Sequence, residues 1–178
     1  MRFIIQRVNN AAVCIKDKED SSSKIGKGLL VFVGINKNDS EESLDFIVDK
    51  LLNIKLFDGD KGERWKESVM SLNLEILIIS NFTLYCNIKG NKLNFSHSMD
   101  GTNAGILFSK LVEKLKAKYK EELIKTGEFG EYMLIDSLSD GPVNIEWDYP
   151  AEKDENLKEE NPKKQGKKNE KKNSKNNE

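Results

Sequence analysis

The sequence predicts an α/β domain, because apolar runs typical of buried strands alternate with two amphipathic helices. The run from Gly28 to Ile35 is continuously apolar and β-branched, as in a central strand covered on both faces. A second central strand is expected from Leu74 to Ser80. Apolar residues recur at helical spacing in two further segments, first Leu44, Ile47, Val48, Leu51 and Leu52, then Ala104, Leu107, Phe108, Leu111, Val112 and Leu115.

The remaining elements are predicted from turn residues and short apolar runs. Residues 2–8 and 11–17 are expected to form an opening hairpin that turns at Asn9-Asn10, followed by a polar loop over 18–24. Asp39 or Ser40 is expected to cap the first helix. A short strand near 54–57 precedes a loop over 58–62, residues 87–101 form a polar connection, and strands over 132–138 and 143–147 flank Gly141-Pro142.

The composition changes at about residue 151, so we expect one domain over 1–149 and a disordered tail over 150–178. Residues 161–178 carry seven Lys and two Glu. Two interpretations of the tail are open. It is either a dispensable, solubilising segment or an electrostatic tether for RNA or DNA. Because the chain has 26 Lys and only three Arg, abundant lysine alone is weak evidence for binding.

The chain is expected to be a cytoplasmic protein that needs no metal or other cofactor. No apolar run reaches the roughly 18 residues of a membrane helix, and the N-terminus does not have the pattern of a signal peptide. Cys14 and Cys86 lie in strand-like apolar surroundings without a metal-ligand spacing, which predicts reduced core residues.

The end of the strand at Leu77 to Leu84 is the first candidate for a reactive site. A buried apolar run ends there in the small hydroxyl and amide side chains of Ser80, Asn81 and Thr83. A second candidate is Asp140-Gly141-Pro142, which holds the only proline of the first 149 residues. A lone Gly-Pro between two apolar stretches fixes the shape of the backbone and leaves its peptide edges usable for recognition.

Six segments, in the same order, resemble the D-aminoacyl-tRNA deacylase family over nearly all of residues 1–149. They are Ile4-Ile5-Gln6-Arg7-Val8, the stretch 26–35, Ser80-Asn81-Phe82-Thr83-Leu84, Lys89-Gly90-Asn91-Lys92, the stretch 126–133, and Asp140-Gly141-Pro142-Val143. The resemblance implies a compact three-layer α/β/β domain with two β-sheets and two main helices, working as a homodimer. It also implies hydrolysis of the ester bond of D-aminoacyl-tRNA, and of glycyl-tRNA, as chiral proofreading in translation.

The resemblance also implies roles for individual residues. Ser80 through Leu84, including Asn81 and Phe82, would line a pocket for the terminal adenosine and its aminoacyl ester, and Phe129 and Met133 would lie near the adenine. Gly141-Pro142 would have a cis peptide bond and reach into the partner subunit's pocket, where it would admit D-residues and exclude L-residues. Arg7 would brace that element across the interface. Without the resemblance, Phe129 and Met133 would be read as core residues and Arg7 as a surface residue.

Two mechanisms are open for the attack on the ester. In the first, Thr83 is the nucleophile, but a threonine hydroxyl needs an activating base and the single histidine, His97, lies in a polar loop. In the second, which we favour, the 2′-hydroxyl of the tRNA assists and the protein positions the ester. In both, the backbone N–H groups of Phe82 and Thr83 are the expected oxyanion donors.

The chain departs from the family pattern at four positions, namely Asn81, Leu93, Ser139 and Asn144. These departures leave a second hypothesis open, that of a weakened or noncatalytic paralogue that binds tRNA or DNA through its basic tail. Deleting the tail separates the two hypotheses, because an enzyme should lose little turnover while a tail-driven binder should lose its salt-dependent affinity.

Overall fold

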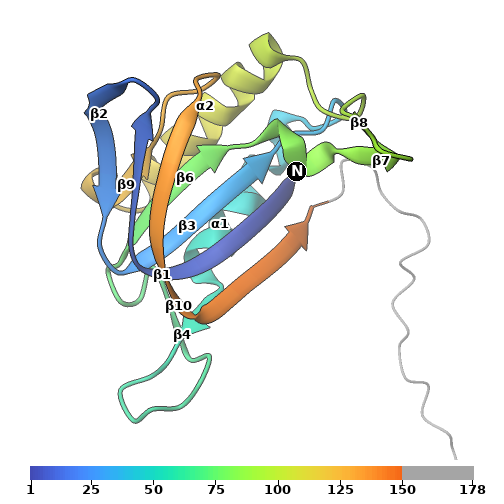
Figure 1. Ribbon diagram of the computed structural model, residues 1–178. Helices are drawn as coiled ribbons and strands as arrows, with labels where there is room; N and C mark the ends of the chain where they lie inside the picture. The colour runs from blue at the N-terminus through green and yellow to red at the C-terminus, as the bar shows by residue number, and fades with distance from the viewer. Residues whose placement is uncertain (150–178) are drawn as a thin grey trace, which may run out of the picture.

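The chain folds around one six-stranded mixed sheet in the order β10, β1, β3, β6, β9, with β2 added to β1 (Figure 1). The computed structural model describes residues 1–149, apart from the side chains of residues 19–21, so the predicted tail over 150–178 lies outside the described residues. The strands of this sheet are β1 (Arg2–Ile15), β2 (Lys18–Ile25), β3 (Gly28–Gly34), β6 (Glu75–Ser80), β9 (Ile124–Thr126) and β10 (Met133–Asp148). Two small sheets pair β4 (Lys55–Phe57) with β5 (Glu67–Ser68) and β7 (Asn87–Lys89) with β8 (Lys92–Asn94).

The predicted hairpin over residues 2–17 is wrong, because these residues form the single long strand β1. Asn9 and Asn10 are exposed and sit at irregularities in the pairing with β10. Neither residue has the positive φ that a tight turn would need. The turn comes later, at Asp17 with φ 67°, and the predicted polar loop over 18–24 is strand β2. Pairing along the whole length of β10 therefore overrides the local turn signal.

The sheet nearly closes on itself, because β1 changes partners along one edge. Its first half pairs with β3 and its second half with β2. β2 in turn approaches β9, where the Ser23 hydroxyl donates to the Thr126 carbonyl at 2.8 Å. The resemblance implied two β-sheets, whereas the structure has this one nearly closed six-stranded sheet and two small two-stranded sheets.

The predictions for the two central strands are confirmed, since β3 and β6 run parallel at the centre of the sheet and are buried on both faces. Leu29, Val31, Ile76 and Ile78 face the main core, which also contains the two helices. The alternate residues face a smaller core beneath the second half of β1 and β2. Truncating a fully buried leucine of this kind to alanine costs about 2–5 kcal/mol.

Two helices cover the main core, as the sequence predicts. They are α1 (Leu44–Asn53), preceded by a short 3₁₀ helix η1 (Glu41–Ser43), and α2 (Gly101–Lys118). The predicted side-chain cap of α1 is wrong, because neither the Ser40 nor the Ser43 hydroxyl accepts a backbone N–H of the helix start, and Ser43 donates to the Ser40 carbonyl instead. Asp39 instead accepts from the ammonium of Met1 at 2.7 Å and from the backbone N–H of Asn36.

Three further expectations change in detail. The predicted polar connection over 87–101 contains the β7–β8 hairpin, and the strands predicted around Gly141-Pro142 form one bent strand, β10. Cys14 and Cys86 are free but partly exposed, because Cys14 lies on the opposite face of β1 from its buried neighbours. None of the helices within residues 1–149 is long and apolar enough to span a membrane.

Candidate active site

A cavity of about 740 Å³ opens at the carboxyl ends of the parallel strands β3 and β6. Strand ends of this kind are a common place for ligand sites in α/β folds. Val33 and Ile35 come from the end of β3, Ser80 ends β6, and Gly101 and Ala104 come from the first turn of α2. The remaining wall is the segment from Phe129 to Met133, between β9 and β10.

The cavity is walled mainly by aromatic and apolar side chains. Phe82 packs edge to face against Phe95 at 5.1 Å between ring centroids, and Phe129 packs against Phe108 of α2. Met99 and Met133 also line it. The cavity has the size and composition of a site for a small molecule or a nucleoside, with a few polar groups to orient the ligand.

The polar groups of the cavity are concentrated at the 3₁₀ helix η2 (Phe82–Tyr85), which follows β6 directly. Asn81 precedes this helix, and its side-chain oxygen accepts both the Thr83 backbone N–H at 3.1 Å and the Thr83 hydroxyl at 2.6 Å. Of the two predicted oxyanion donors, the Thr83 N–H is therefore already hydrogen-bonded to Asn81. Within the described residues, the Phe82 N–H has no acceptor.

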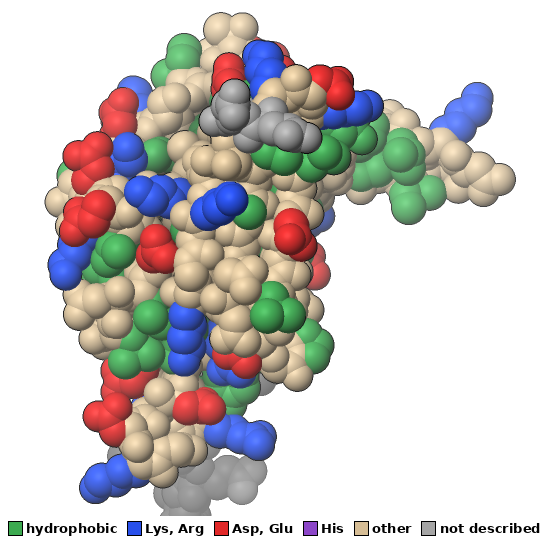
Figure 2. Space-filling view, turned by 60° about the vertical axis from the view of Figure 1, so that its left-hand side comes forward, with side chains coloured by type: hydrophobic (Ala, Val, Ile, Leu, Met, Phe, Trp, Pro, Cys, Tyr) green, Lys and Arg blue, Asp and Glu red, His purple; other side chains and the backbone are tan. Residues whose placement is uncertain are grey.

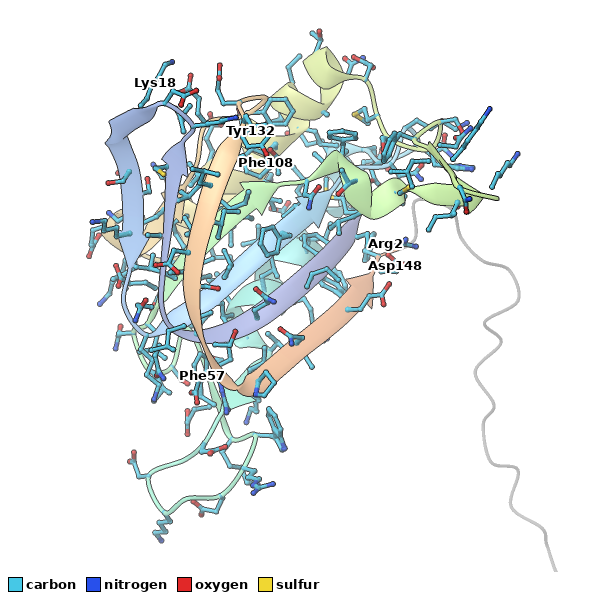
Figure 3. The ribbon with its side chains drawn as sticks, viewed as in Figure 1. Arg2, Lys18, Phe57, Phe108, Tyr132 and Asp148 are labelled. Atoms are coloured by element: carbon cyan, nitrogen blue, oxygen red, sulfur yellow. The ribbon has the colours of Figure 1, made fainter. Side chains whose placement is uncertain are left out.

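Three contacts fix the position of η2 against the rest of the domain. The Ser98 hydroxyl donates to the Phe82 carbonyl at 3.0 Å, and Arg2 donates to the Leu84 carbonyl at 3.0 Å. Arg2 also faces Asp148 at the end of β10 and bonds to both its carboxylate oxygens (Figure 3). Gly34 is essential here, because a Cβ at that position would lie 2.8 Å from the Leu84 Cβ.

The cavity brings together most, but not all, of the residues that the sequence singled out. Ser80, Asn81, Phe82, Thr83, Phe129 and Met133 line it, whereas Leu84 packs against Gly34 and does not. Sequence reasoning missed Phe95, Ser98, Met99, Glu131 and Tyr132. Residues 95–99 lie in a stretch whose sequence predicts only a polar connection, and no local pattern marks them as part of the cavity wall.

The cavity does not have the groups of a nucleophilic triad or a metal centre. His97 is exposed and is not part of the lining, and the closest partner of the Thr83 hydroxyl is an amide, which is not a base. Across residues 1–149, no three His, Cys, Asp or Glu side chains are grouped as metal ligands would be. The arrangement is therefore suited to orienting a reactive substrate.

The N-terminus of α2 is fixed beside the cavity by Asp100. One carboxylate oxygen of Asp100 accepts the Asn103 backbone N–H at 3.1 Å, and the other accepts the Asn103 side chain at 2.8 Å. The backbone hydrogen bond from Asn103 lowers the pKa of Asp100, and the side-chain bond adds to this shift. The cap stays ionised at neutral pH and holds the first turn of α2, which contains Gly101 and Ala104.

Gly141-Pro142 lies at the other end of the sheet, and none of its atoms lines the cavity. Gln6 pairs with Asn144 and Val8 with Ser139, so the element sits level with Arg7. Val8 also pairs with Gly28, at the amino end of β3. Since the cavity is at the carboxyl end of this seven-residue strand, the two sites are about 20 Å apart. In Figure 3, Tyr132 at the cavity and Phe57 of β4 lie toward opposite ends of the domain.

Arg7 holds the Gly141-Pro142 segment within its own chain. Its guanidinium donates to the Asp140 carbonyl at 3.2 Å, pairs with the Asp140 carboxylate at 3.2 Å and donates to the Leu56 carbonyl at 2.8 Å. It also lies over the ring of Trp65. The Gly141-Pro142 bond is cis, and Gly141 has φ 125°, a conformation that disfavours any side chain. Both residues are exposed at the tip.

Comparison with known proteins gives one consistent result. A family model described as D-Tyr-tRNA(Tyr) deacylase matches residues 4–148. The D-aminoacyl-tRNA deacylase of Drosophila melanogaster is 43% identical over 154 residues, which are 86% of this chain and 96% of the relative. D-aminoacyl-tRNA deacylase 1 of Mus musculus is 39% identical over 151 residues, covering 85% of this chain and 71% of the relative.

Solved structures also resemble this chain over most of its length. One described as "c-Myc DNA Unwinding Element Binding Protein" superimposes with a TM-score of 0.79 at 39% identity, covering 84% of this chain and 99% of that one. Another, described as "a probable eukaryotic D-amino acid tRNA deacylase", has a TM-score of 0.71 at 17% identity, covers 83% of this chain and 98% of that one, and supports the fold alone.

Proposed function

This chain belongs to the D-Tyr-tRNA(Tyr) deacylase family, and we propose that it hydrolyses the ester bond of D-aminoacyl-tRNA to release free D-amino acid and tRNA. The observation that carries the proposal is the aromatic cavity at the ends of β3 and β6, in a chain that matches the family over residues 4–148. The substrate places the reaction in translation quality control, and we expect it in the cytoplasm.

The terminal adenosine of the tRNA is the part of the substrate that the cavity walls fit best. Phe129, Met133 and Tyr132 come from one segment of the lining, and Phe82 and Phe95 from another. Stacking of a base on an aromatic side chain contributes about 1–3 kcal/mol and does not depend on reading its edge. Adenosine bound in this way would place its ester near Ser80, Asn81 and Thr83.

We favour a mechanism in which the protein positions the ester and the tRNA's own 2′-hydroxyl assists the attacking water. Water adds to the ester carbonyl carbon, the bond to the ribose 3′-oxygen breaks, and a proton passes to that leaving oxygen. The Phe82 N–H is the donor best placed to stabilise the oxyanion, because it is unpaired among the described residues. The Thr83 hydroxyl donates to Asn81, so its role would be to hold the donor loop in place.

Chiral selection would come from a second subunit. Gly141-Pro142 lies about 20 Å from the cavity of its own chain, so it can reach a cavity only in a partner. Strand β10 is at the edge of the sheet and exposes Leu134, Ile135 and Leu138, which supports a homodimer formed along this strand. The tip would hold the substrate's α-amino group and leave no room for an L side chain, so glycine would also be accepted.

The decisive assay offers D- and L-aminoacyl-tRNA with the same side chain. The proposal expects hydrolysis of the D form and not of the L form. Hydrolysis of neither form, or of both at equal rates, would refute it. A second pair of measurements tests the mechanism, since Thr83→Ala should keep substantial activity whereas a 2′-deoxy terminal adenosine should abolish it. The reverse pair of results would establish Thr83 as the nucleophile.

A noncatalytic nucleic-acid-binding function is the second candidate, and one observation favours it. The solved structure with 39% identity is described as binding a DNA unwinding element. Deleting residues 151–178 distinguishes the two functions. The enzyme would keep its turnover, whereas a binder that depends on the basic tail would lose most of its affinity and the salt dependence of binding.

A further inference from the structure

The β7–β8 hairpin projects from the domain (Figure 1) and directly follows η2, whose residues Phe82 and Thr83 line the cavity. Its first strand follows η2, and its second strand leads back to Phe95 and Ser98, both of which line the cavity. The base of the hairpin is anchored, because Phe95 packs against Phe82 and the Ser98 hydroxyl donates to the Phe82 carbonyl. The hairpin itself is exposed along its whole length. A ligand that fills the cavity and continues outward would meet this hairpin.

The chain segment that contains the hairpin lacks acidic residues. The chain has 30 Asp and Glu, yet none occurs between Glu75 and Asp100, where Lys89, Lys92 and His97 are the ionisable cations. Figure 2 shows the projection at the upper right with hydrophobic and basic side chains, and with no acidic side chain on the visible face. A polyanion could approach this part of the surface without meeting a carboxylate on the hairpin.

The two faces of the hairpin differ in chemistry. Directly opposed residues lie on the same face, and the pairs alternate between faces along the strands. Ile88 faces Leu93 on one side, and both are exposed, at 73% and 62%. Lys89 faces Lys92 on the other side, together with the pair Asn87 and Asn94. Two like charges directly opposite each other destabilise a hairpin on its own. An anion bound between them would remove that repulsion.

The turn keeps the two lysines in register. Gly90 and Asn91 form a two-residue connection in which Gly90 has φ 59°, as expected for glycine at the first central position of a type II′ turn. The pairing fixes the separation of the two ammonium groups better than an irregular loop would. Ammonium and amide groups held in this way are typical ligands of nucleic-acid phosphates.

We propose that the Lys89 and Lys92 face of this hairpin binds phosphates of the tRNA acceptor end, just outside the cavity that holds the terminal adenosine. The inference rests on the proposed function. Strands of three residues reach about 10 Å from the cavity wall, so the lysines meet nucleotides that precede the adenosine. The contacts are to the backbone, so they contribute affinity without reading the sequence of the tRNA.

The test compares two double variants. The hairpin variant carries both Lys89→Ala and Lys92→Ala, and the matched control carries both Lys24→Ala and Lys120→Ala. The control removes the same charge from exposed lysines on β2 and beyond the C-terminal end of α2, remote from the cavity. Each protein is assayed with D-aminoacyl-tRNA and with D-aminoacyl-adenosine, which lacks the acceptor stem. Binding of an uncharged acceptor-stem minihelix is measured separately by fluorescence anisotropy over a range of salt concentrations.

The hairpin variant should raise KM for the tRNA substrate about tenfold at roughly 0.1 M salt, with kcat unchanged and no effect on the short substrate. The slope of log affinity for the minihelix against log salt should fall by about 1.5, as expected for two lost phosphate contacts. The control and the charge-preserving Lys89→Arg with Lys92→Arg variant should behave like the wild type. If the alanine variant of the hairpin keeps the wild-type KM and the wild-type affinity for the minihelix, the inference is overturned.

Two other results are separable from that outcome. A wild type that binds the minihelix through the lysines but hydrolyses no D-aminoacyl-tRNA would refute the proposed function and leave the hairpin contact standing. If the hairpin instead binds a protein, the double variant Ile88→Ser and Leu93→Ser would change the mass of the assembly in solution. The lysine variant would then bind the minihelix as the wild type does. That result also overturns the inference.

Discussion

The two ends of the central sheet are built for different tasks. The cavity end joins apolar and aromatic walls from four separate segments. Beside it, Asn81 accepts the Thr83 N–H and Ser98 donates to the Phe82 carbonyl. The Gly141-Pro142 end is an exposed tip held by the guanidinium of Arg7. The cavity is suited to binding and orienting an ester, whereas the tip is suited to filling space in another molecule.

This difference explains how one small domain could combine chemistry with chiral selection. Among the described residues, neither end pairs a hydroxyl or thiol nucleophile with a histidine base, and the two ends of one chain do not meet. A two-fold dimer in which the cavity of each chain faces the Gly141-Pro142 tip of the other would complete both sites, each from two rigid parts. Substitutions at either end should therefore damage activity by distinguishable routes.

The largest effect is expected from Gly141→Ala at the tip. A Cβ at this φ of 125° would lie 2.9 Å from the Val143 side chain and 3.4 Å from Arg7, so the tip must shift. Misplacing a positioning group by about 1 Å costs roughly 100-fold in rate. We expect that loss in kcat/KM for D-aminoacyl-tRNA, measured under single-turnover conditions.

Binding of adenosine alone serves as the control for Gly141→Ala, because it involves only the cavity. It should remain as in the wild type. Equal losses of adenosine binding and of turnover would mean that the tip and the cavity are not separate parts of the site.

The next effect is expected from Asn81→Ala at the cavity. The substitution removes the acceptor of both the Thr83 N–H and the Thr83 hydroxyl, which loosens the start of η2. We expect kcat to fall about 30-fold, because the oxyanion donor at Phe82 loses its fixed position. Asn81→Asp keeps an acceptor at the same place and should recover part of the rate. If Thr83→Ala proved more damaging than Asn81→Ala, the positioning role of the amide would be contradicted.

A smaller loss is expected from Arg7→Ala, which weakens the tip without changing it directly. The substitution removes the hydrogen bonds to the Asp140 and Leu56 carbonyls and the contact with Trp65. We expect about a tenfold lower kcat/KM and a relaxed preference for D over L substrates. Arg7→Lys should restore little, since a lysine cannot make the two diverging bonds. A variant with lower activity but an unchanged D/L ratio would show that Arg7 acts on stability alone.

The smallest effect concerns the acid side of the stability profile. The pKa of Asp100 in the folded state lies below the usual value of 3.8. Ionised Asp100 therefore stabilises the fold above pH 3.8, and this stabilisation is lost as the pH falls through the folded-state pKa. At pH 7, Asp100→Ala should lower Tm by about 3 °C. The difference in Tm from the wild type should shrink below pH 3.8. A difference that stays constant from pH 7 to pH 2 would rule out the ionised cap as its cause.

The elements that the sequence predicted well are those whose signal is local and periodic. Strands β3 and β6 and helices α1 and α2 follow directly from apolar spacing, because each buries a continuous face. The β1–β2 region was predicted wrongly, since Asn9-Asn10 is a good turn signal that long pairing with β10 overrides. Tertiary pairing of this kind leaves no trace in a short window of sequence.

The candidate site shows the same limit. Ser80 to Thr83 could be found from the sequence, because an apolar strand ends there in polar side chains. Phe95, Ser98 and Tyr132 could not, because they reach the cavity only when the connection after β8 and the segment before β10 fold against η2. The pairing of Lys89 with Lys92 likewise became visible only with the register of the hairpin.

The central claim is that each working site combines the cavity of one chain with Gly141-Pro142 of another. Mixing two impaired variants tests it most directly, with Ala104→Phe to fill the cavity and Gly141→Ala to disturb the tip. Each variant alone should be nearly inactive on D-aminoacyl-tRNA. After co-refolding, mixed dimers hold one intact cavity facing one intact tip, so activity should recover to about one quarter of the wild type. A mixture that stays as inactive as its components would contradict the account.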